Sequence, residues 1–274
     1  IIIDNFSSER YISFITLKNR RKIIFFDEDL IHFDKKKIKH NIDCIIHLAS
    51  TTNAEKSFSN KKSVLDNNVQ STKKILTLGK KKTKIIFASS TSVYGNQYKI
   101  INSKNNHINI SPQSPYAQSK ILCENIIKKN SKNYCIMRFG TIFGMSDGMR
   151  FHTAINKFCY QASLDKKITI WKKFYKKKRP YLDLNDCVRS IIFTIFNQKI
   201  KNETLDVVTV NLKVIEIIKE IEKLKKIKKT FVNTKILNQL SYEVHSDRLN
   251  SLDFKFNENL FNSIHKTIKK LNIG

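Results

Sequence analysis

Short apolar runs alternate with longer stretches of helical periodicity along the first two thirds of the chain. Near-continuous apolar runs are typical of strands that are covered on both faces. Helical spacing of apolar side chains occurs between them, at residues 63–79 and 116–130. The predicted strands are residues 1–4, 22–26, 43–49, 84–90 and 134–140. Strand and helix in repetition predict an α/β fold with a doubly wound parallel sheet.

The last third of the chain has a different pattern. Residues 211–229 are amphipathic and predict one helix, and residues 257–271 predict another. These helices suggest a smaller, mixed second lobe, and the lack of a Pro-, Gly- or Ser-rich linker indicates that the two lobes pack together. The expected sheet domain comprises residues 1–145 and roughly 181–211, and the expected smaller lobe comprises residues 146–180 and 212–274.

The composition favours a protein of the reducing cytoplasm. Its 274 residues suffice for a sizeable core without covalent staples. The five cysteines include no Cys-x-x-Cys pair and mostly fall in apolar runs, as reduced buried thiols do. No apolar stretch approaches the roughly 20 residues of a membrane helix, and the opening residues lack the basic region of a signal peptide. We therefore expect neither a membrane partner nor a metal site.

The formal net charge of +28 raises nucleic acid as a partner. The lysines, however, are spread through nearly every segment, whereas a nucleic-acid surface clusters its charge and interleaves aromatic or Arg residues. Residues 172–179, KKFYKKKR, are the best local exception. The charge therefore indicates a compositional bias of the whole chain more than a nucleic-acid surface.

Polar residues follow the predicted strands, at the points where the strands end. In an open parallel sheet, ligands bind beyond the carboxyl ends of the strands. We therefore expect these side chains to converge on one crevice. They are Asp4 and Asn5, Asp27, residues 49–52, residues 89–92, and Gly140 with Thr141.

The heptapeptide SPYAQSK, residues 114–120, places Tyr116 and Lys120 four positions apart at the start of a predicted helix. This spacing puts both side chains on one helix face. Among 9 tyrosines in so lysine-rich a chain, such a pair is expected about once by chance, a risk that any short motif carries. The pair alone therefore favours a surface Tyr and a surface Lys over a catalytic pair.

Ordered blocks along nearly the whole chain resemble one family, the extended short-chain dehydrogenase/reductases. The resemblance is to the NAD-dependent nucleotide-sugar epimerases and dehydratases, whose fold is Rossmann-like. The order and spacing of the blocks are more specific than any one of them. The blocks are DN (4–5), FDEDL (26–30), HLAS (47–50), DNNVQST (66–72), SSTSVYG (89–95), SPYAQSK, RFGTIFG (138–144), RPYLDLNDCV (179–188) and SDRLNSLDFKF (246–256), in which Asp253 replaces the family's glycine.

The resemblance implies that Tyr116 is the catalytic acid/base. A free phenol has a pKa near ~10, so a nearby ammonium must favour the phenolate at neutral pH. Lys120 supplies that charge in the family and also contacts the nicotinamide ribose. Ser90 matches the active-site hydroxyl, and Ser92 lies on the same side of a pleated strand and could share its role. The alternative for both serines is a strand end whose hydroxyls cap backbone groups.

The resemblance also implies which residues hold the cofactor. Asp4 would accept hydrogen bonds from the adenosine ribose hydroxyls and repel a 2′-phosphate, which favours NAD over NADP. Each of the other positions could also be explained by packing or by a turn. The full set of expected cofactor positions is Asp4, Asn5, Asp27, Leu48, Ala49, Ser50, Thr52, Asn67, Ser89, Tyr116, Lys120 and Gly140.

The expected substrate is a nucleotide-diphosphate sugar. Arg150 and Arg179 fall where the family meets the diphosphate, and the planar guanidinium binds phosphate in a bidentate manner. Ser92, Thr141 and Asn156 would take sugar or phosphate oxygens. The resemblance also implies a homodimer formed by the helix of Tyr116 and the helix before it, although their apolar faces could equally pack within one chain.

The chain departs from the family at its beginning. The family opens with a strand and a Gly-x-x-Gly-x-x-Gly turn whose amides hold the cofactor pyrophosphate. None of the six glycines makes such a turn, and the chain starts at what resembles the second strand. One βα unit of roughly 30 residues is therefore expected to be missing. We expect either a fragment of a longer protein, which we favour, or a degenerate member.

The block after the active-site hydroxyl favours one reaction. Elimination or enolisation needs an additional acid/base, which dehydratases and decarboxylating relatives carry there as carboxylates. Residues 90–94, STSVY, contain none. This favours a 4-epimerase, which oxidises the sugar transiently and returns the hydride to the other face. A 4-keto reductase, a dehydratase, a sugar dehydrogenase and a non-catalytic relic that acts as a binding module remain the alternatives.

Overall fold

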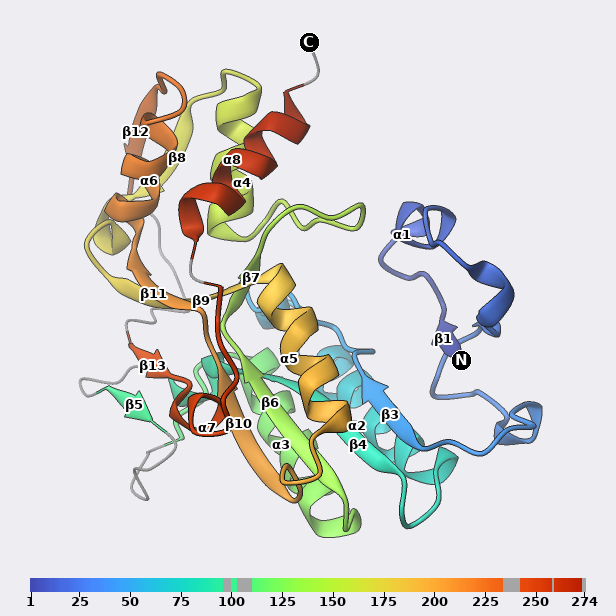
Figure 1. Ribbon diagram of the computed structural model, residues 1–274. Helices are drawn as coiled ribbons and strands as arrows, with labels where there is room; N and C mark the ends of the chain where they lie inside the picture. The colour runs from blue at the N-terminus through green and yellow to red at the C-terminus, as the bar shows by residue number, and fades with distance from the viewer. Residues whose placement is uncertain (96–99, 103–109, 234–241, 258, 273–274) are drawn as a thin grey trace.

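The computed structural model describes residues 1–95, 100–102, 110–233, 242–257 and 259–272 (Figure 1). Its centre is a four-stranded parallel sheet in the order β10-β6-β4-β3. The strands are β3 (Cys44–His47), β4 (Lys84–Ser90), β6 (Tyr134–Phe139) and β10 (Glu203–Val207). The predicted α/β fold with a parallel sheet is confirmed.

Helices cover both faces of this sheet (Figure 1). On one face, α2 (Lys61–Leu78) packs along α3 (Pro115–Asn130), and both lie on the strands. Phe87 and Ile136 share an apolar cluster with these two helices, whereas Ile86 and Met137 share another with α5 (Leu184–Phe196). Because neighbouring residues of a strand point to opposite faces, α5 lies on the face opposite α2 and α3.

The first 30 residues form a separate arm, drawn in dark blue in Figure 1. The arm contains α1 (Tyr11–Ile15) and a parallel pair, β1 (Ile2–Asp4) and β2 (Phe25–Asp27). Within the described residues, this pair is a sheet of its own and does not extend the four-stranded sheet. The expectation that all predicted strands form one sheet is therefore wrong for these two.

The second half of the chain adds mixed elements around a second apolar core. A three-stranded sheet has the order β11-β9-β7, and β8 pairs with β12. The strands are β7 (Thr141–Phe143), β8 (Ile168–Trp171), β9 (Lys178–Asp183), β11 (Val210–Lys213) and β12 (Lys229–Val232). The helices α4 (Ala154–Ser163), α6 (Val214–Glu222) and α8 (Leu260–Leu271) share this core. The boundaries between the two lobes stay a prediction.

Smaller elements complete the fold. The pair β5 (Ile101–Asn102) and β13 (Val244–His245) is parallel, and α7 (Asp247–Asn250) lies beside β10. The 3₁₀ helices are η1 (Arg20–Lys22), η2 (Lys35–Lys37), η3 (Lys56–Phe58), η4 (Thr91–Tyr94) and η5 (Lys172–Phe174).

The long helix predicted over residues 211–229 is only half as long as expected. The helix α6 begins at Val214 and ends at Glu222, and both flanks are strands. The preceding β11 pairs antiparallel with β9, and the following β12 pairs in parallel with β8. The pairing partners therefore overrode the helical pattern at both ends. The helix predicted over 257–271 is present as α8.

Asp253 occupies a backbone conformation that favours glycine. Its φ is 65°, in the left-handed region. The amide of Asp253 donates to the carbonyl of Asn250, and the amide of Phe254 donates to that of Leu249, which ends α7. Aspartate enters this region more easily than most residues with a side chain. This conformation accounts for the glycine that the similar family has where this chain has Asp253.

Candidate active site

Tyr116 lies on the first turn of α3, at the carboxyl end of the central sheet. The Oγ of Ser114 accepts a hydrogen bond from the amide of Ala117 at 3.1 Å and caps the helix, and Pro115 occupies the first helical position. The amide of Tyr116 donates to the Oγ of Ser57 at 3.3 Å. The local sequence therefore determines where the helix starts, and the distant Ser57 contacts the amide of Tyr116.

The side chain of Tyr116 hydrogen-bonds to that of Ser90. Ser90 is the last residue of β4, and its Oγ accepts from the amide of Ser92 at 3.2 Å, so that it also caps η4. The functional and the capping interpretations of Ser90 are therefore compatible. One hydroxyl at the strand end reaches both the backbone and the phenol.

Lys120 is buried one turn after Tyr116. Its Nζ donates to the carbonyl of Ala88 at 2.8 Å and lies 4.8 Å from the ring centroid of Phe87 and 5.7 Å from that of Tyr116. Burial lowers the pKa of Lys120 to about 8. The ammonium is thus anchored on the strand, beside the Tyr116 ring.

Burial dominates the electrostatics of Tyr116. It raises the pKa of Tyr116, while the hydrogen bond with Ser90 and the charge of Arg150 act in the opposite direction. The resemblance assigned this lowering effect to Lys120, and that role stays a prediction. In the structure, Ser90 and Arg150 act in this direction.

Arg150 reaches the site from the loop between β7 and α4. Its Nη1 donates to the Oγ1 of Thr52 at 2.5 Å, and so joins this loop to the loop that follows β3. Asn68 holds the loop after β3: its side chain accepts from the amide of Thr51 at 2.8 Å and donates to the carbonyl of Thr51 at 3.1 Å. The cofactor role expected for the neighbouring Asn67 stays a prediction.

Further cations surround Arg150. Burial lowers the pKa of His152, and the positive charges of Arg150, Arg10 and Lys56 lower it further. Burial and the charge of Arg10 also lower the pKa of Arg150 itself. A group of positive charges beside Tyr116 suits an anionic ligand.

Tyr242 is a site residue that the sequence analysis missed. Its hydroxyl donates to the Oγ1 of Thr91 at 3.2 Å. Burial raises the pKa of Tyr242 to about 12, the hydrogen bond with Thr91 and the charge of Arg179 lower it, and Tyr116 is close enough to raise it. Arg179 also lies 5.2 Å from the ring centroid of Phe174. Tyr242 thus lies close enough to both Arg179 and Tyr116 for their charges to shift its pKa.

Two buried hydroxyls in this region have no hydrogen-bond partner within the described chain. They are the Oγ atoms of Ser50 and Ser92. Because a buried hydroxyl without a partner is costly, such groups usually indicate a ligand or ordered water. Both serines were among the residues expected to contact cofactor or substrate.

The acidic and amide residues of the arm lie at the carboxyl ends of its two strands. Asp4 and Asp27 are paired in register, and both are exposed. The Oδ1 of Asp4 accepts from the amide of Phe6, and Asn5 donates to the Oδ2 of Asp29 at 2.9 Å. Leu48 and Ala49, at the end of β3, are also exposed. Their cofactor roles stay predictions.

Other predicted residues have evident structural partners. Ser89 donates to the Oε1 of Glu124 at 2.5 Å, and Asn156 joins the amide of Gly144 to the carbonyl of Arg150. A Cβ on Gly140 would lie 3.2 Å from the backbone of Pro180, so glycine permits close approach of β9. Asn67 donates to the Oγ1 of Thr51 at 3.2 Å, and Thr141 begins β7 opposite Tyr181.

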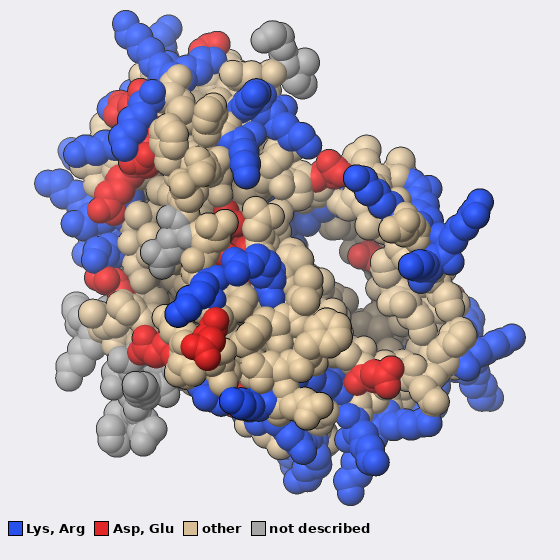
Figure 2. All heavy atoms as spheres, viewed as in Figure 1, with Lys and Arg blue, Asp and Glu red and all other residues tan. Residues whose placement is uncertain are grey.

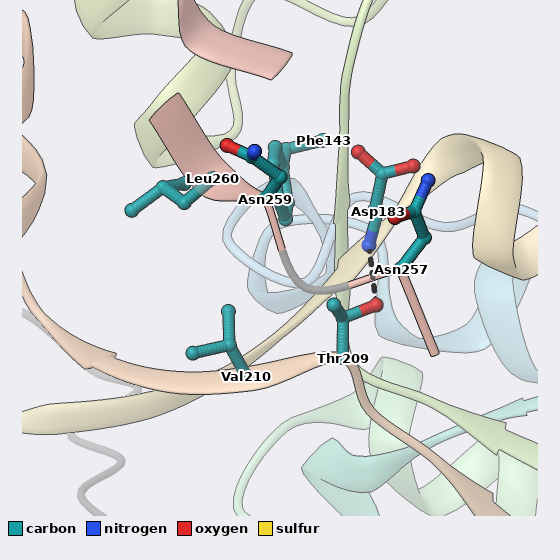
Figure 3. A pocket seen from close by; sticks show the side chains of 7 residues that line it. All are labelled: Phe143, Asp183, Thr209, Val210, Asn257, Asn259 and Leu260. Carbon is teal, nitrogen blue, oxygen red and sulfur yellow. Dashed lines mark hydrogen bonds between the residues drawn. The ribbon is translucent and has the colours of Figure 1, made fainter. Parts of the chain in front are cut away.

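A cavity of about 90 Å³ lies elsewhere, beneath the start of α8 (Figure 3). The carboxylate of Asp183 faces its polar side, and Val210 and Leu260 line its apolar side. That carboxylate already accepts from the amide of Asn185 at 2.8 Å and from the Oγ of Ser263 at 2.5 Å. The cavity shares no lining residue with the Tyr116 site, and its polar groups serve the packing of α8.

The described residues lack two kinds of feature. None of their helices is both long and apolar enough to span a membrane. They also contain no group of three or more His, Cys, Asp or Glu side chains placed to hold a metal ion.

The chain is similar to known proteins of one family. A model of the NAD dependent epimerase/dehydratase family matches residues 9–208. A dTDP-D-glucose 4,6-dehydratase of Dictyostelium discoideum is 29% identical over 193 residues, which cover 64% of this chain and 43% of that protein. This chain therefore spans less than half the length of that relative.

Solved structures show the same fold. A UDP-glucuronic acid 4-epimerase from Bacillus cereus, in complex with UDP-glucuronic acid and NAD, superposes with a TM-score of 0.83 at 23% identity, over 98% of this chain and 90% of that one. A UDP-N-acetylglucosamine 4-epimerase from Methanobrevibacter ruminantium M1 superposes with a TM-score of 0.84 at 21% identity, over 98% and 88%. At these identities the likeness concerns the fold alone.

Proposed function

Because the chain belongs to the NAD dependent epimerase/dehydratase family, we propose that it acts on a nucleotide-diphosphate sugar as a 4-epimerase. The observation that carries the proposal is the contact between the Tyr116 and Ser90 side chains at the end of β4, with Lys120 anchored one turn away. This arrangement places a phenol, a hydroxyl and an ammonium where one sugar hydroxyl could meet them. The 4-epimerases of this fold supply the analogy.

In the proposed reaction, Tyr116 takes the proton of the sugar 4-hydroxyl while the C4–H bond breaks. Bound NAD would supply the acceptor and donor of the C4 hydride. Ser90 hydrogen-bonds the reacting oxygen and relays its proton, and Arg150 holds the diphosphate through its charge. After the 4-keto sugar has rotated and presents its other face, Tyr116 gives the proton back to the oxygen. The proton and the hydride are both restored, so the product is an isomer.

The described residues fit a dinucleotide in part. The partnerless hydroxyl of Ser50 lies in the loop after β3, and Asp4 and Asp27 project from the carboxyl ends of the arm strands. These groups would hold a ribose of the dinucleotide and the atoms next to that ribose. The glycine turn that would hold the pyrophosphate is not among them, since none of the six glycines belongs to such a motif.

The surroundings of Ser90 support epimerisation over dehydration. Residues 90–94 contain no carboxylate that could serve as an extra acid/base. The buried Glu124 is held by Arg138 at 2.6 and 2.9 Å and by Ser89. Both carboxylate oxygens of Glu124 are thus occupied by hydrogen bonds within the protein. The dehydratase remains the second candidate, because the Dictyostelium discoideum relative bears that name.

The test is turnover of UDP-glucuronic acid, UDP-glucose and UDP-N-acetylglucosamine in the presence of NAD, followed by proton NMR. An epimerase inverts the configuration at C4, whereas a dehydratase yields a keto-deoxy product. Proton NMR distinguishes the two products. Tyr116→Phe should lower kcat by about 10²- to 10⁴-fold, the usual contribution of a general acid/base. Tyr134→Phe is the control, because Tyr134 lies at the far end of β6. Equal turnover by Tyr116→Phe and wild type would refute the proposed role.

We also propose that the protein is a homodimer that pairs through α2 and α3. Leu122 on α3 is an exposed apolar residue and supports this surface.

A further inference from the structure

A row of polar side chains crosses three neighbouring strands of the central sheet. Ser89 on β4, Arg138 on β6 and Asp206 on β10 are paired in register. Ser89 and Arg138 lie two positions after Phe87 and Ile136, so the row points to the face that α2 and α3 cover. Ser89 is 4%, Arg138 6% and Asp206 4% exposed. Because buried polar groups are costly without hydrogen bonds, each member of the row needs a partner.

Arg138 joins this row into one buried network. Its Nε and Nη2 donate to the two carboxylate oxygens of Glu124 at 2.9 and 2.6 Å, and its Nη1 donates to the hydroxyl of Tyr94 at 2.9 Å. Because that hydroxyl accepts from the guanidinium, it donates its one proton to the Oδ1 of Asp206, at 2.6 Å. Glu124 also accepts from the Oγ of Ser89 at 2.5 Å. The network therefore runs without interruption from Ser89 to Asp206.

The network holds the backbone on both sides of Ser90. Ser89 precedes Ser90 on β4, and Tyr94 is the last residue of η4. Ser90 caps η4, because its Oγ accepts from the amide of Ser92. A displacement of Tyr94 would therefore move this short turn and the hydroxyl that caps it. The same hydroxyl contacts Tyr116.

We propose that the buried network positions the Ser90 hydroxyl against Tyr116, and that the negative charge of Asp206 strengthens this hold. Arg138, Tyr94 and Asp206 are then positioning residues that act through η4. Because the contact between Ser90 and Tyr116 belongs to the proposed function, the inference rests on that function. A hydrogen bond to an ionised carboxylate is about twice as strong as one between neutral groups. Protonation of Asp206 therefore weakens its bond with Tyr94 and, through η4, the hold on Ser90.

The groups around Asp206 decide at which pH this charge is present. Burial raises the pKa of Asp206 to about 6, and the carboxylates of Glu124 on α3 and Asp247 on α7 raise it as well. The hydrogen bond with Tyr94 and the charge of Arg138 lower it. Lys and Arg side chains cover much of the visible surface (Figure 2), but Arg138 is the cation that acts on this buried carboxylate. Asp206 is thus ionised at pH 7 and becomes neutral as the pH falls through about 6.

Carbon-13 NMR tests the inference without cofactor or substrate. Tyrosine labelled at Cζ gives one signal for each of the 9 tyrosines, and the variants Tyr116→Phe and Tyr94→Phe identify two of these signals by their loss. Aspartate labelled at Cγ reports the titration of Asp206, which Asp206→Asn identifies in the same way. Both phenols stay protonated below about pH 8, because a free phenol has a pKa near ~10 and burial raises the pKa of Tyr94 and of Tyr116. Their signals therefore report changes in their surroundings.

In the wild-type protein, the signals of Tyr94 and Tyr116 should both move with the titration of Asp206, whose midpoint is about pH 6. Asp206→Asn should abolish both movements. In Tyr94→Phe, Asp206 should still titrate, at a higher pH because the hydrogen bond that lowers its pKa is lost, and the Tyr116 signal should no longer follow it. The matched control is Asp165→Asn, which removes an exposed carboxylate that pairs with Lys225 at 3.0 Å and should leave both movements unchanged. Circular dichroism spectra that match those of wild type establish that the variants fold.

Turnover of a nucleotide-diphosphate sugar adds a second measurement. The kcat should fall as the pH drops through about 6, and this decline should be absent in Asp206→Asn. Tyr94→Phe should lower kcat about tenfold at pH 7 and leave KM unchanged, since a misplacement of about 1 Å can cost about 10²-fold and a smaller displacement of the Ser90 hydroxyl costs less.

A Tyr116 signal that does not follow the titration of Asp206 in the wild-type protein would overturn the inference, and this result requires no variant of Tyr94 to fold. A Tyr116 signal that follows Asp206 equally in Tyr94→Phe would also overturn it, because the charge would then act directly and not through η4. The proposed function fails separately. A protein that shows the coupled movement but turns over no sugar keeps the positioning network and loses the epimerase.

Discussion

Replacing Glu124 with glutamine tests the buried ion pair beneath the candidate site. Arg138 donates from Nε to Oε1 of Glu124 at 2.9 Å and from Nη2 to Oε2 at 2.6 Å. The side chains are 8% and 1% exposed. The pair links α3, which carries Tyr116 and Lys120, to β6, and Arg138 also donates to the hydroxyl of Tyr94 at 2.9 Å. Loss of the Glu124–Arg138 pair would weaken the contact between β6 and α3, the helix that carries Tyr116 and Lys120.

The expected loss of unfolding free energy follows from the groups that remain in Glu124→Gln. Gln keeps the shape and one acceptor oxygen but no charge, so the guanidinium of Arg138 stays buried without its counter-charge. Breaking a buried pair from one side costs about 3–5 kcal/mol, and the remaining oxygen places the expected loss near the lower value. For a domain of this size, a loss of about 3 kcal/mol lowers Tm by about 6–12 °C.

Urea unfolding and thermal melts followed by circular dichroism measure this loss. The matched control is Glu220→Gln, which removes a surface pair with Lys223 at 2.6 Å. An exposed pair contributes at most about 1 kcal/mol, so this variant should resemble wild type. If Glu124→Gln unfolds within about 1 kcal/mol of wild type, like the control, then the pair does not hold α3 against β6 and the reasoning is refuted.

Two further predictions concern stability. Burial raises the pKa of Asp206 from its ordinary value of 3.8 to about 6, so the folded state holds that proton more tightly than the unfolded state. The contribution of Asp206 to the unfolding free energy should therefore be fully present below about pH 4, and about 3 kcal/mol of it should be lost as the pH rises through about 6. Asp206→Asn should remove this part of the profile in urea titrations from pH 4 to 7, and overlapping profiles would contradict the prediction. Asp253→Gly should raise the unfolding free energy by about 1 kcal/mol, because glycine adopts the φ of 65° without steric cost. Asp253→Val should lower the unfolding free energy. Equal urea unfolding of the two variants would show that the conformation is unstrained.

Local patterns in the sequence were sufficient for the central elements. The apolar run 84–90 coincides with β4, and the helical pattern 116–130 with α3, because each pattern agrees with the partners that the element finds in the fold. The spacing of Tyr116 and Lys120 and the cap at Ser114 are properties of a single turn of helix. Their positions could therefore be predicted without any knowledge of the rest of the chain.

The tertiary structure decided the features that depend on distant partners. Residues 210–213 and 229–232 are strands because β9 and β8 offer edges to pair with, and the helical pattern gave no sign of this. Arg150, Thr52 and Tyr242 converge on the Tyr116 region from three different loops, and Arg138 finds Glu124 across two elements. Hydrogen bonds and charges between such segments depend on distance in space. The sequence by itself determined which helix carries Tyr116 and Lys120, whereas the burial and the charges that set their pKa values arise only when the chain is folded.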